Sequence, residues 1–389
     1  MSRPADLVMI LENCGYSLDS RVLNEAESLL ESGLSVEVLS PREPDRPRRE
    51  VINGVRVTRF PVFEGHGELL GTAIEYLGVF CFVAPAVLTR LLRSRRGTLH
   101  VHNPPDMFFP LLMLARLRGW TTVFDLHDDA AGMVRARLGR PTALESLMAW
   151  MQRQSARSSD LTITTNQTQR TLVERVASRV VVVRNAPPDW FADHKPSPPA
   201  GRARLVFLGE LGIQDGAERT LDILSLLVNE RQLDVELLVI GEGRQRHAVE
   251  ERAALLGLSD RLTITGWVPY ERVPELLASA HVGLDTAPMT DVNQGSTMVK
   301  IVEYLVVGLP VVATALRETR VTGGDAVIAI DDGDVEAFVA PIARLLTDRE
   351  AWRAAAELAS ARGEELRWAA QAAVLRDAYR DLRRSGRAS

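Results

Sequence analysis

The fold class of this chain is decided by the segment Asn293-Gln-Gly-Ser-Thr-Met-Val-Lys-Ile-Val-Glu303, which runs on into Tyr304-Leu-Val-Val-Gly-Leu-Pro-Val-Val312. A Gly-Ser-Thr turn opens a predicted helix, and the first turn of a helix can receive a diphosphate. Glu303 lies seven residues after Ser296, so both are expected on one side of that helix, where a carboxylate suits ribose hydroxyls. Lys300 lies in the same helix. The plainer interpretation is that Glu303 and Lys300 only solvate an exposed helix face.

Short apolar runs alternate with helical patterns along the whole chain, which is typical of parallel βαβ units. A helix is expected near Ser20–Ser32, and Gly54 is expected to close a hairpin. In the first half the predicted strands are Leu7–Leu11, Val36–Leu39, Val51 with Val57–Phe60, Leu99–His102, Thr121–Asp125, Leu161–Thr164 and Val180–Arg184. In the second half they are Leu205–Leu208, Glu236–Ile240, Leu262–Thr265, Val282–Leu284, Val311–Ala313 and Ala326–Ile330.

The chain is expected to divide into two doubly wound α/β domains that face each other across a cleft. The Pro- and Gly-rich segment 195–201 is the expected linker between domains 1–194 and 202–365. Residues from Ala351 to about Arg384 form one long helical pattern. We expect its last part, 366–389, to be able to pack back on the first domain.

Composition excludes several classes of protein. The 389 residues have 46% hydrophobic and 25% charged side chains with a net charge of −5, as in soluble globular proteins without a nucleic-acid-binding surface. Two cysteines, Cys14 and Cys81, are too few for a disulfide scaffold or a zinc cluster, so a reducing cytoplasm is the expected location. No secretory signal is recognised at the start. Charged residues and Pro85 interrupt the apolar stretch Leu69–Leu92, which favours a buried or surface-seated helix pair over a membrane span.

Three further segments of the second half place glycines where predicted strands end. They are Gly209-Glu-Leu-Gly-Ile-Gln-Asp-Gly216, Ile240-Gly-Glu-Gly243 and Gly266-Trp-Val-Pro-Tyr270. Such loops present backbone N–H groups that suit a phosphate, although each alone is also an ordinary turn. Together they indicate one ligand-binding edge. The first half has Glu12-Asn-Cys-Gly-Tyr16 after its first strand instead of a dinucleotide fingerprint, which argues against hydride transfer.

These motifs together resemble the retaining glycosyltransferases of family 4, which have the GT-B fold of two Rossmann-like domains. The resemblance covers nearly the whole chain, and it is strongest to the bacterial subgroup of polysaccharide and natural-product assembly. It implies a cytoplasmic enzyme that moves a sugar from a nucleotide sugar, most simply a UDP-sugar, to a hydroxyl acceptor. Members of this fold usually act without a metal, so no metal and no cofactor are expected.

The resemblance also implies roles for residues of the second domain. Glu303 is expected to bind the donor ribose, the backbone of Thr297, Met298 and Val299 the diphosphate, and the Trp267–Val268 loop the nucleobase. Lys300 is counted with the catalytic residues. The remaining expected donor-binding positions are Gly209, Glu210, Leu211, Gly241, Glu242 and Ser296.

In the first domain the segment Asp125-Leu-His-Asp128 matches the place where the family keeps a histidine beside the sugar. His127 is therefore the expected contact with the reacting centre, although a strand-end histidine packed under the cleft is the plainer alternative. His100 and His102 alternate on one strand and share a face, but two histidines without a third ligand are weak evidence for a metal. The expected acceptor-side residues are Asp19, Arg21, His102, Asn103 and Asp128.

The chain departs from the family pattern at positions that bear charge. Glu210 stands where much of the family has Arg, Asp215 where it has Lys, and Val299 where the subgroup has Asn. The missing cations normally neutralise the departing diphosphate, an effect worth several kcal/mol. Lys300 and the helix N-terminus are the expected replacements. The first glutamate of the family's glutamate pair falls on Gly295.

Two other functions stay open on the sequence alone. A GT-B sugar-nucleotide epimerase shares the fold, but we find no paired carboxylates for proton removal beyond Asp128 and Asp129. A catalytically silent nucleotide-sugar-binding subunit of a transferase complex is compatible with the lost cations. The acceptor is open among lipid-linked sugars, polysaccharide precursors and small natural products. The arginines near Ala86–Leu92 suit weak peripheral contact with anionic lipid at the inner face of a membrane, while core packing with a solvated arginine cluster explains the same pattern.

Overall fold

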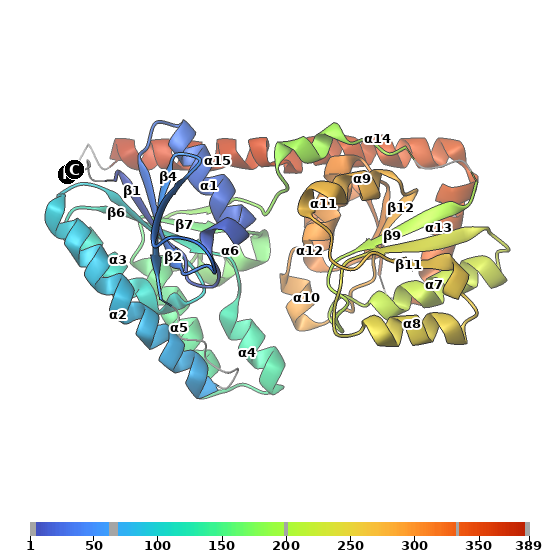
Figure 1. Cartoon of the computed structure of the whole chain (residues 1–389), viewed down its shortest axis with the longest axis horizontal. Helices are drawn as coiled ribbons and strands as arrows, with labels where there is room; N and C mark the ends of the chain where they lie inside the picture. Colours follow the sequence, from blue (N-terminus) through green and yellow to red (C-terminus); the bar gives the residue numbers. More distant parts are fainter. Residues whose placement is uncertain (1–4, 62–68, 198–200, 332–333, 386–389) are drawn as a thin grey trace. The chain divides into compact units, whose positions relative to one another are not determined.

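The computed structural model describes residues 5–61, 69–197, 201–331 and 334–385, and it divides into two compact units. The first unit comprises Met1–Arg184 with Gln371–Ser389, and the second comprises Asn185–Ala370 (Figure 1). The change of unit therefore comes about ten residues before the predicted linker 195–201, which lies in the second unit and whose residues 198–200 fall outside the described residues.

The first unit is built on an eight-stranded sheet of order β3-β4-β2-β1-β5-β6-β7-β8. Only the β3–β4 hairpin is antiparallel, and Gly54 turns it with a φ of 86°. The predicted strands all form, with small differences at their ends. They are β1 (Leu7–Ile10), β2 (Val36–Pro41), β3 (Arg49–Ile52), β4 (Val55–Phe60), β5 (Thr98–His102), β6 (Thr121–Leu126), β7 (Leu161–Thr164) and β8 (Val180–Val182).

Helices cover this sheet because each keeps an apolar stripe for it. In α1 the Asp19 carboxylate accepts the Val22 N–H and so satisfies one free donor of the first turn. In α2, Val83 and Val87 enter the core beside Ile10 and Leu99. The helices of the first unit are α1 (Ser20–Glu31), α2 (Leu69–Arg93), α3 (Phe109–Leu117), α4 (Ala130–Leu138), α5 (Ala143–Arg157) and α6 (Gln167–Val173).

The second unit has a fully parallel six-stranded sheet of order β11-β10-β9-β12-β13-β14. Its strands are β9 (Ala203–Leu208), β10 (Val235–Ile240), β11 (Leu262–Ile264), β12 (Val282–Asp285), β13 (Val311–Thr314) and β14 (Val327–Ile330). Its helices are α7 (Ala217–Asn229), α8 (Arg246–Leu255), α9 (Val273–Ala278), α10 (Asp291–Gly295), α11 (Val299–Val307), α12 (Arg317–Gly323), α13 (Val335–Thr347) and α14 (Arg349–Leu366). Two apolar clusters form the core of this unit.

Two helical predictions are wrong in detail. The stretch 69–93 is one helix of 25 residues with Pro85 inside it, rather than a pair. The long pattern after Ala351 is two helices, α14 and α15 (Trp368–Ser385). Arg367 adopts an extended backbone, with φ −65° and ψ 161°, and so breaks the chain of helical hydrogen bonds between them.

Helix α15 packs on the first unit with its later turns. The Tyr379 hydroxyl lies 2.7 Å from Nδ1 of His100, and Arg179 pairs with Asp381 at 2.9 Å. The segment that follows Gln371 thus supplies a buried side chain to the first sheet.

Each sheet has one point where the strand order reverses, between β1 and β5 in the first unit and between β9 and β12 in the second. In open α/β sheets, ligands bind outside the carboxyl ends of the strands at such points. Both topologies are doubly wound, as the sequence predicts.

Candidate active site

Glycines bring the strand ends of the second unit close together. Gly209 and Gly241 both have positive φ, and a Cβ on Gly241 would lie 1.9 Å from the Gly209 carbonyl oxygen. Gly241 and Gly266 also pair in an isolated bridge. Any other residue at 241 would push the β9 and β10 ends apart. The three glycine segments of the sequence therefore meet at one edge of the sheet.

Lys300 lies at this edge as a buried cation. Its side chain is 7% exposed, and Nζ lies 2.7 Å from Oδ1 of Asp215 and 3.8 Å from Oδ1 of Asp285. It also lies 4.4 Å from the centroid of the Phe207 ring. A Cβ on Gly209 would come within 3.1 Å of Nζ, so the ammonium group borders the backbone of the β9 end. Solvation of an exposed helix face is excluded for this residue.

Asp285, which ends β12, is a member of the site that sequence reasoning missed. Its Oδ2 atom is buried and has no hydrogen-bond partner among the residues that the structure describes. Burial raises the pKa of this carboxyl, and the Lys300 ammonium opposes that rise. Nothing in the run Val-Gly-Leu-Asp285 marks the last residue as more than a strand end.

Glu303 is buried on the same helix, one turn beyond Lys300. Its side chain is 6% exposed and accepts a hydrogen bond of 2.8 Å from the Tyr270 hydroxyl. Burial raises the pKa of Glu303, while the Tyr270 bond and the Lys300 charge lower it. Tyr270 belongs to the quoted segment Gly266–Tyr270, but its pairing with a residue 33 positions away had no local signal.

The helix that carries both residues begins later than predicted. Ser296 ends the short helix α10, and its hydroxyl bonds the Val292 carbonyl, whereas α11 begins at Val299 with Met298 as its N-cap. The expectation that Ser296 and Glu303 share one helix face is therefore wrong, because an extended residue separates the two helices. The backbone of Thr297, Met298 and Val299 does lead to the free N-terminus of α11, where anions are stabilised.

The other expected donor residues differ in how accessible they are. Trp267 is exposed and Val268 half-buried, as a loop beside a base requires, and Glu210 is exposed. Glu242 is exposed and pairs with Arg246 at 2.6 Å. The Leu211 side chain is buried in the core, so only its backbone can face a ligand.

In the first unit the centre of the candidate site is a buried ion pair. The Arg21 guanidinium donates two hydrogen bonds, of 3.0 and 3.1 Å, to the two oxygens of Asp125 and a third, of 2.8 Å, to the Val183 carbonyl. Burial alone would raise the pKa of Asp125, but Arg21 and His127 hold it well below its usual range. Asp125 is therefore a fixed anion at the carboxyl end of β6.

His127 lies directly beside this anion. Its Nε2 is 3.0 Å from Oδ2 of Asp125 and 3.1 Å from Nδ1 of His102, and the side chain is 10% exposed. Asn103 accepts the His127 backbone N–H at 2.5 Å, and the Gln169 amide donates to the His127 carbonyl at 2.6 Å. The ring is thus oriented by its neighbours from both sides, while a small part of it reaches the surface.

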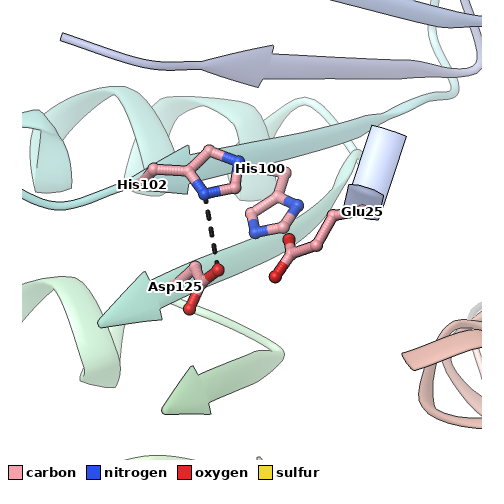
Figure 2. Close-up of side chains that lie close together, drawn as sticks. All are labelled: Glu25, His100, His102 and Asp125. Carbon is pink, nitrogen blue, oxygen red and sulfur yellow. Dashed lines mark ion pairs between the residues drawn. The ribbon is translucent and has the colours of Figure 1, made fainter. Parts of the chain in front are cut away.

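Behind His127 lies a closed group of titratable side chains (Figure 2). Glu25 of α1, His100 and His102 of β5 and Asp125 of β6 converge, and each is fully buried. Burial lowers the pKa of both histidines, and it lowers that of His100 well below its usual range. The Tyr379 hydroxyl contacts the His100 ring. Burial and the Asp125 charge raise the pKa of Glu25 well above its usual range. Burial thus favours the uncharged forms of both histidines and of Glu25.

These four side chains are also the residues that come nearest to a metal site. One ligand atom from each lies within 4.8 Å of the others. The sequence offered two histidines without a third ligand, and the fold supplies two carboxyls beside them. However, the Arg21 guanidinium already occupies both oxygens of Asp125 and lies 3.1 Å from Glu25. The Arg21 guanidinium thus compensates the charge of Asp125, so the group does not require a further cation.

The expected acceptor-side residues fall into two sets. Arg21, His102 and Asn103 are buried and hydrogen-bonded within the first unit, so they position Asp125 and His127 rather than meet a ligand directly. Asp19 is half-buried at the start of α1, and Asp128 is exposed after β6. The sequence does not distinguish the two sets, because the burial of each side chain depends on how α1 and β5 pack in the fold.

Two family models match the two halves of the chain. Residues 18–186 match the glycosyl transferase 4-like domain, and residues 202–348 match the glycosyl transferases group 1. The chain is 25% identical to the 2-deoxystreptamine N-acetyl-D-glucosaminyltransferase of Streptomyces fradiae, over 86% of this chain and 83% of the relative. It is 26% identical to the 2-deoxystreptamine glucosyltransferase of Streptomyces kanamyceticus, over 75% and 79% of the two chains.

A solved structure shows the same architecture. HepE of Anabaena, in complex with UDP and glucose, superposes with a TM-score of 0.67 at 15% identity, over 97% of this chain and 99% of that one. A sugar-nucleotide epimerase is not among the functions that the two family models describe. The chain therefore belongs to the glycosyltransferases of the GT-B fold, with a glycosyltransferase 4-like first unit and a group 1 second unit.

Proposed function

We propose that this glycosyltransferase moves a hexosyl group, with retention of configuration, from a UDP-sugar to a hydroxyl of a small polyhydroxylated acceptor. The observation that carries the proposal is the pair of buried charged residues, Lys300 and Glu303, on one helix at the glycine-lined end of β9 and β10. Buried charges are costly unless they are used or paired, and both lie where a nucleotide sugar binds in this fold.

The second unit binds the donor. Glu303, held by Tyr270, takes the ribose hydroxyls, and the N-terminus of α11 takes the diphosphate through backbone N–H groups. The UDP assignment is supported by HepE, whose structure holds UDP and glucose. The exposed Trp267 is the group that would lie against the base.

Lys300 supplies the cation that this chain lacks at 210 and 215, where it has Glu and Asp in place of the family's Arg and Lys. When the sugar–phosphate bond breaks, negative charge develops on the diphosphate, and a preorganised ammonium group in a partly dry site stabilises it. Asp215 holds Lys300 in place in the free protein. As the diphosphate enters, Lys300 exchanges part of this ion pair for the phosphate oxygens.

The first unit binds the acceptor and presents His127. The bond between C1 of the sugar and the phosphate oxygen breaks through an oxocarbenium-like state. The acceptor oxygen attacks C1 from the same face, and its proton passes to an oxygen of the departing diphosphate. His127, whose Nε2–H donates to Asp125, accepts a hydrogen bond from a sugar hydroxyl at Nδ1 and so orients the sugar. No protein nucleophile is required.

The acceptor class is inferred from relatives. Two of them are named for transfer to 2-deoxystreptamine, a small ring with several hydroxyl and amino groups. The exposed Asp128 and half-buried Asp19 would suit amino or hydroxyl groups on such a ring. A lipid-linked sugar or a polysaccharide precursor is the alternative acceptor.

The test is a thermal-shift screen against UDP-, GDP-, ADP- and TDP-sugars, followed by assay of the hit with 2-deoxystreptamine. A donor at about one hundred times its dissociation constant stabilises the protein by about 2.7 kcal/mol. One UDP-sugar hit that is lost in Glu303→Ala, together with product of retained configuration, supports the proposal. Binding without product on any acceptor would leave the silent-subunit interpretation, and inverted product would overturn the mechanism.

A further inference from the structure

The outer face of helix α2 is apolar. Leu77, Leu88 and Leu92 are 59%, 41% and 73% exposed, and Cys81 and Pro85 are exposed between them. These positions recur at three- and four-residue intervals and form one continuous stripe. The side chains of this helix are described from Tyr76 to Arg93, and among them the last residue, Arg93, is the exposed charged one.

The opposite stripe of α2 already serves the core. Val79, Val83, Val87 and Leu91 are buried against the sheet. A surface helix normally turns polar residues toward water, and a helix that is apolar all round is normally covered on all sides. By length and composition, Tyr76–Arg93 could even cross a membrane, although its inner stripe packs on β-strands. The outer stripe therefore calls for a covering partner.

The neighbouring helix α3 extends the apolar surface. Met113 and Leu117 are 50% and 83% exposed. Figure 1 shows α2 and α3 side by side along one side of the first unit, and the two helices contact each other. Large exposed apolar patches of this kind mark sites of association.

Arginines gather where this surface ends. Arg93, Arg95 and Arg96 are exposed at the end of α2, and Arg118 follows α3 and bonds the Leu91 carbonyl at 3.3 Å. Arg90, in contrast, is committed to Glu37. The three exposed guanidinium groups form no ion pair with a described residue. The surface is thus apolar along its length and cationic at one end.

A cavity of about 690 Å³ opens at the same end. Helix α2 contributes Thr89 and Arg93 to its wall, and the hairpin contributes Arg48 and Arg49. The two carboxylates of the wall are already neutralised, Glu37 by Arg90 and Glu50 by Arg46 and Arg59. The cavity therefore has a net positive charge and a size that accepts a phosphate-bearing group.

We propose that this face of the first unit binds the surface of an anionic phospholipid membrane. The stripe of α2 and α3 enters the boundary between headgroups and acyl chains, and the arginine-lined cavity receives a lipid phosphate. Apolar and phosphate-binding surfaces lie next to each other, as the two parts of a phospholipid do. Charge complementarity selects the lipid over a second copy of the chain, which offers no phosphate to these arginines. The inference does not depend on the donor site.

The experiment is sedimentation of the full chain with vesicles of phosphatidylcholine alone or mixed with phosphatidylglycerol. Sedimentation with the mixed vesicles alone, falling as salt increases, is the expected result. The double variant Leu88→Glu with Leu92→Glu should bind at least about tenfold more weakly. The matched control is Leu255→Glu, a leucine 81% exposed on α8 of the second unit, which should bind as the parent protein does.

A second variant tests the cavity. Arg48→Gln with Arg49→Gln should weaken binding to mixed vesicles about fivefold per arginine and flatten the salt dependence. Soluble glycerol phosphate should compete poorly with the vesicles for the protein. If the protein binds glycerol phosphate but not the vesicles, the lipid proposal is overturned in favour of a free phosphate ligand.

Three other results would also overturn the proposal. They are no sedimentation with either vesicle, equal sedimentation with both, and a dimer in light scattering that Leu88→Glu with Leu92→Glu dissociates. The last would assign the face to a second copy. Because all substituted side chains are exposed, each variant is expected to keep the melting temperature of the parent protein. If the melting temperature of the double glutamate variant falls, Leu88→Ser with Leu92→Ser is tested in its place.

Discussion

Lys300 Nζ lies 2.7 Å from Oδ1 of Asp215, so a buried ion pair lies at the glycine-lined end of β9. The aspartate stands where the resemblance leads us to expect lysine, and the lysine of the pair comes from α11. The two positions are 85 residues apart and meet at the end of β9. Lys300 thus places an ammonium group at this strand end, and Asp215 neutralises it in the free protein.

Removal of Lys300 should slow the reaction, whereas removal of Asp215 should not weaken donor binding. Lys300→Met should lower kcat by about a hundredfold or more, because the developing diphosphate charge loses its cation. Asp215→Asn should keep or raise affinity for UDP, because Lys300 no longer has a competing anion. Calorimetric titration with UDP and steady-state kinetics measure both. Equal loss of affinity in both variants would show that the pair only maintains the fold.

Glu303→Ala should weaken UDP-sugar binding by about ten- to a hundredfold, the value of one or two hydrogen bonds to a charged group. Tyr270→Phe removes only the hydroxyl that donates to Glu303, so a smaller loss is expected. Calorimetry with UDP and with the free base uracil separates the two parts of the ligand. If Glu303→Ala binds UDP as the parent protein does, Glu303 has no ribose contact.

His127→Ala should lower kcat by about a hundredfold or more while UDP binding stays unchanged, since the ring is proposed to orient the sugar and not the nucleotide. His247→Ala is the matched control, because His247 is a solvent-exposed histidine on α8 of the second unit. The measurement is kcat and the UDP dissociation constant of the parent protein and of both variants. A loss of UDP affinity equal to the loss of kcat would contradict this role.

The stability of the protein should depend on pH through His100. Its folded pKa lies well below the unfolded value of about 6.5, so below that value only the unfolded chain takes up the proton. The free energy of unfolding contributed by this residue is therefore present at higher pH and falls as pH decreases from about 6.5, by at most about 1.4 kcal/mol per pH unit. His102 acts in the same direction, and Glu25, with a raised pKa, in the opposite one.

His100→Gln isolates this contribution. Chemical unfolding of the parent and the variant between neutral pH and pH 5 should show a smaller loss of stability with acid in the variant, whatever its stability at neutral pH. Parallel curves for the two proteins would exclude His100 as the source of the pH dependence.

Chelation should leave glycosyl transfer unaffected. The Arg21 guanidinium compensates the charge of Asp125 in the group of Glu25, His100, His102 and Asp125, so no metal ion is needed there for charge balance. Lys300 supplies the positive charge at the diphosphate. Activity after dialysis against EDTA, and again after addition of Mg²⁺ or Zn²⁺, measures this. A loss with EDTA that Zn²⁺ restores would assign a metal to the buried group, and restoration by Mg²⁺ alone would assign it to the donor diphosphate.

The sequence was most informative where structure depends on neighbours along the chain. Apolar runs such as Leu7–Leu11 and Val311–Ala313 mark strands, and glycines 209, 241 and 266 mark their ends, because strand burial and turn geometry are local properties. Periodicity was less informative about helix ends. The extended backbone at Ser296 and Arg367 interrupts patterns that continue through them, so two expected helices begin or end elsewhere.

What the sequence by itself determined is thus the order of the elements, the two doubly wound units and the motif that carries Lys300 and Glu303. Only the tertiary structure decided which side chains meet. Arg21 binds Asp125 across 104 positions, and Tyr379 reaches His100 across 279. The physical reason is that strand order in a parallel sheet, and the helices that cover it, bring together residues whose spacing in the chain has no period. Burial then fixes their charge states, which no single residue's surroundings in the sequence reveal.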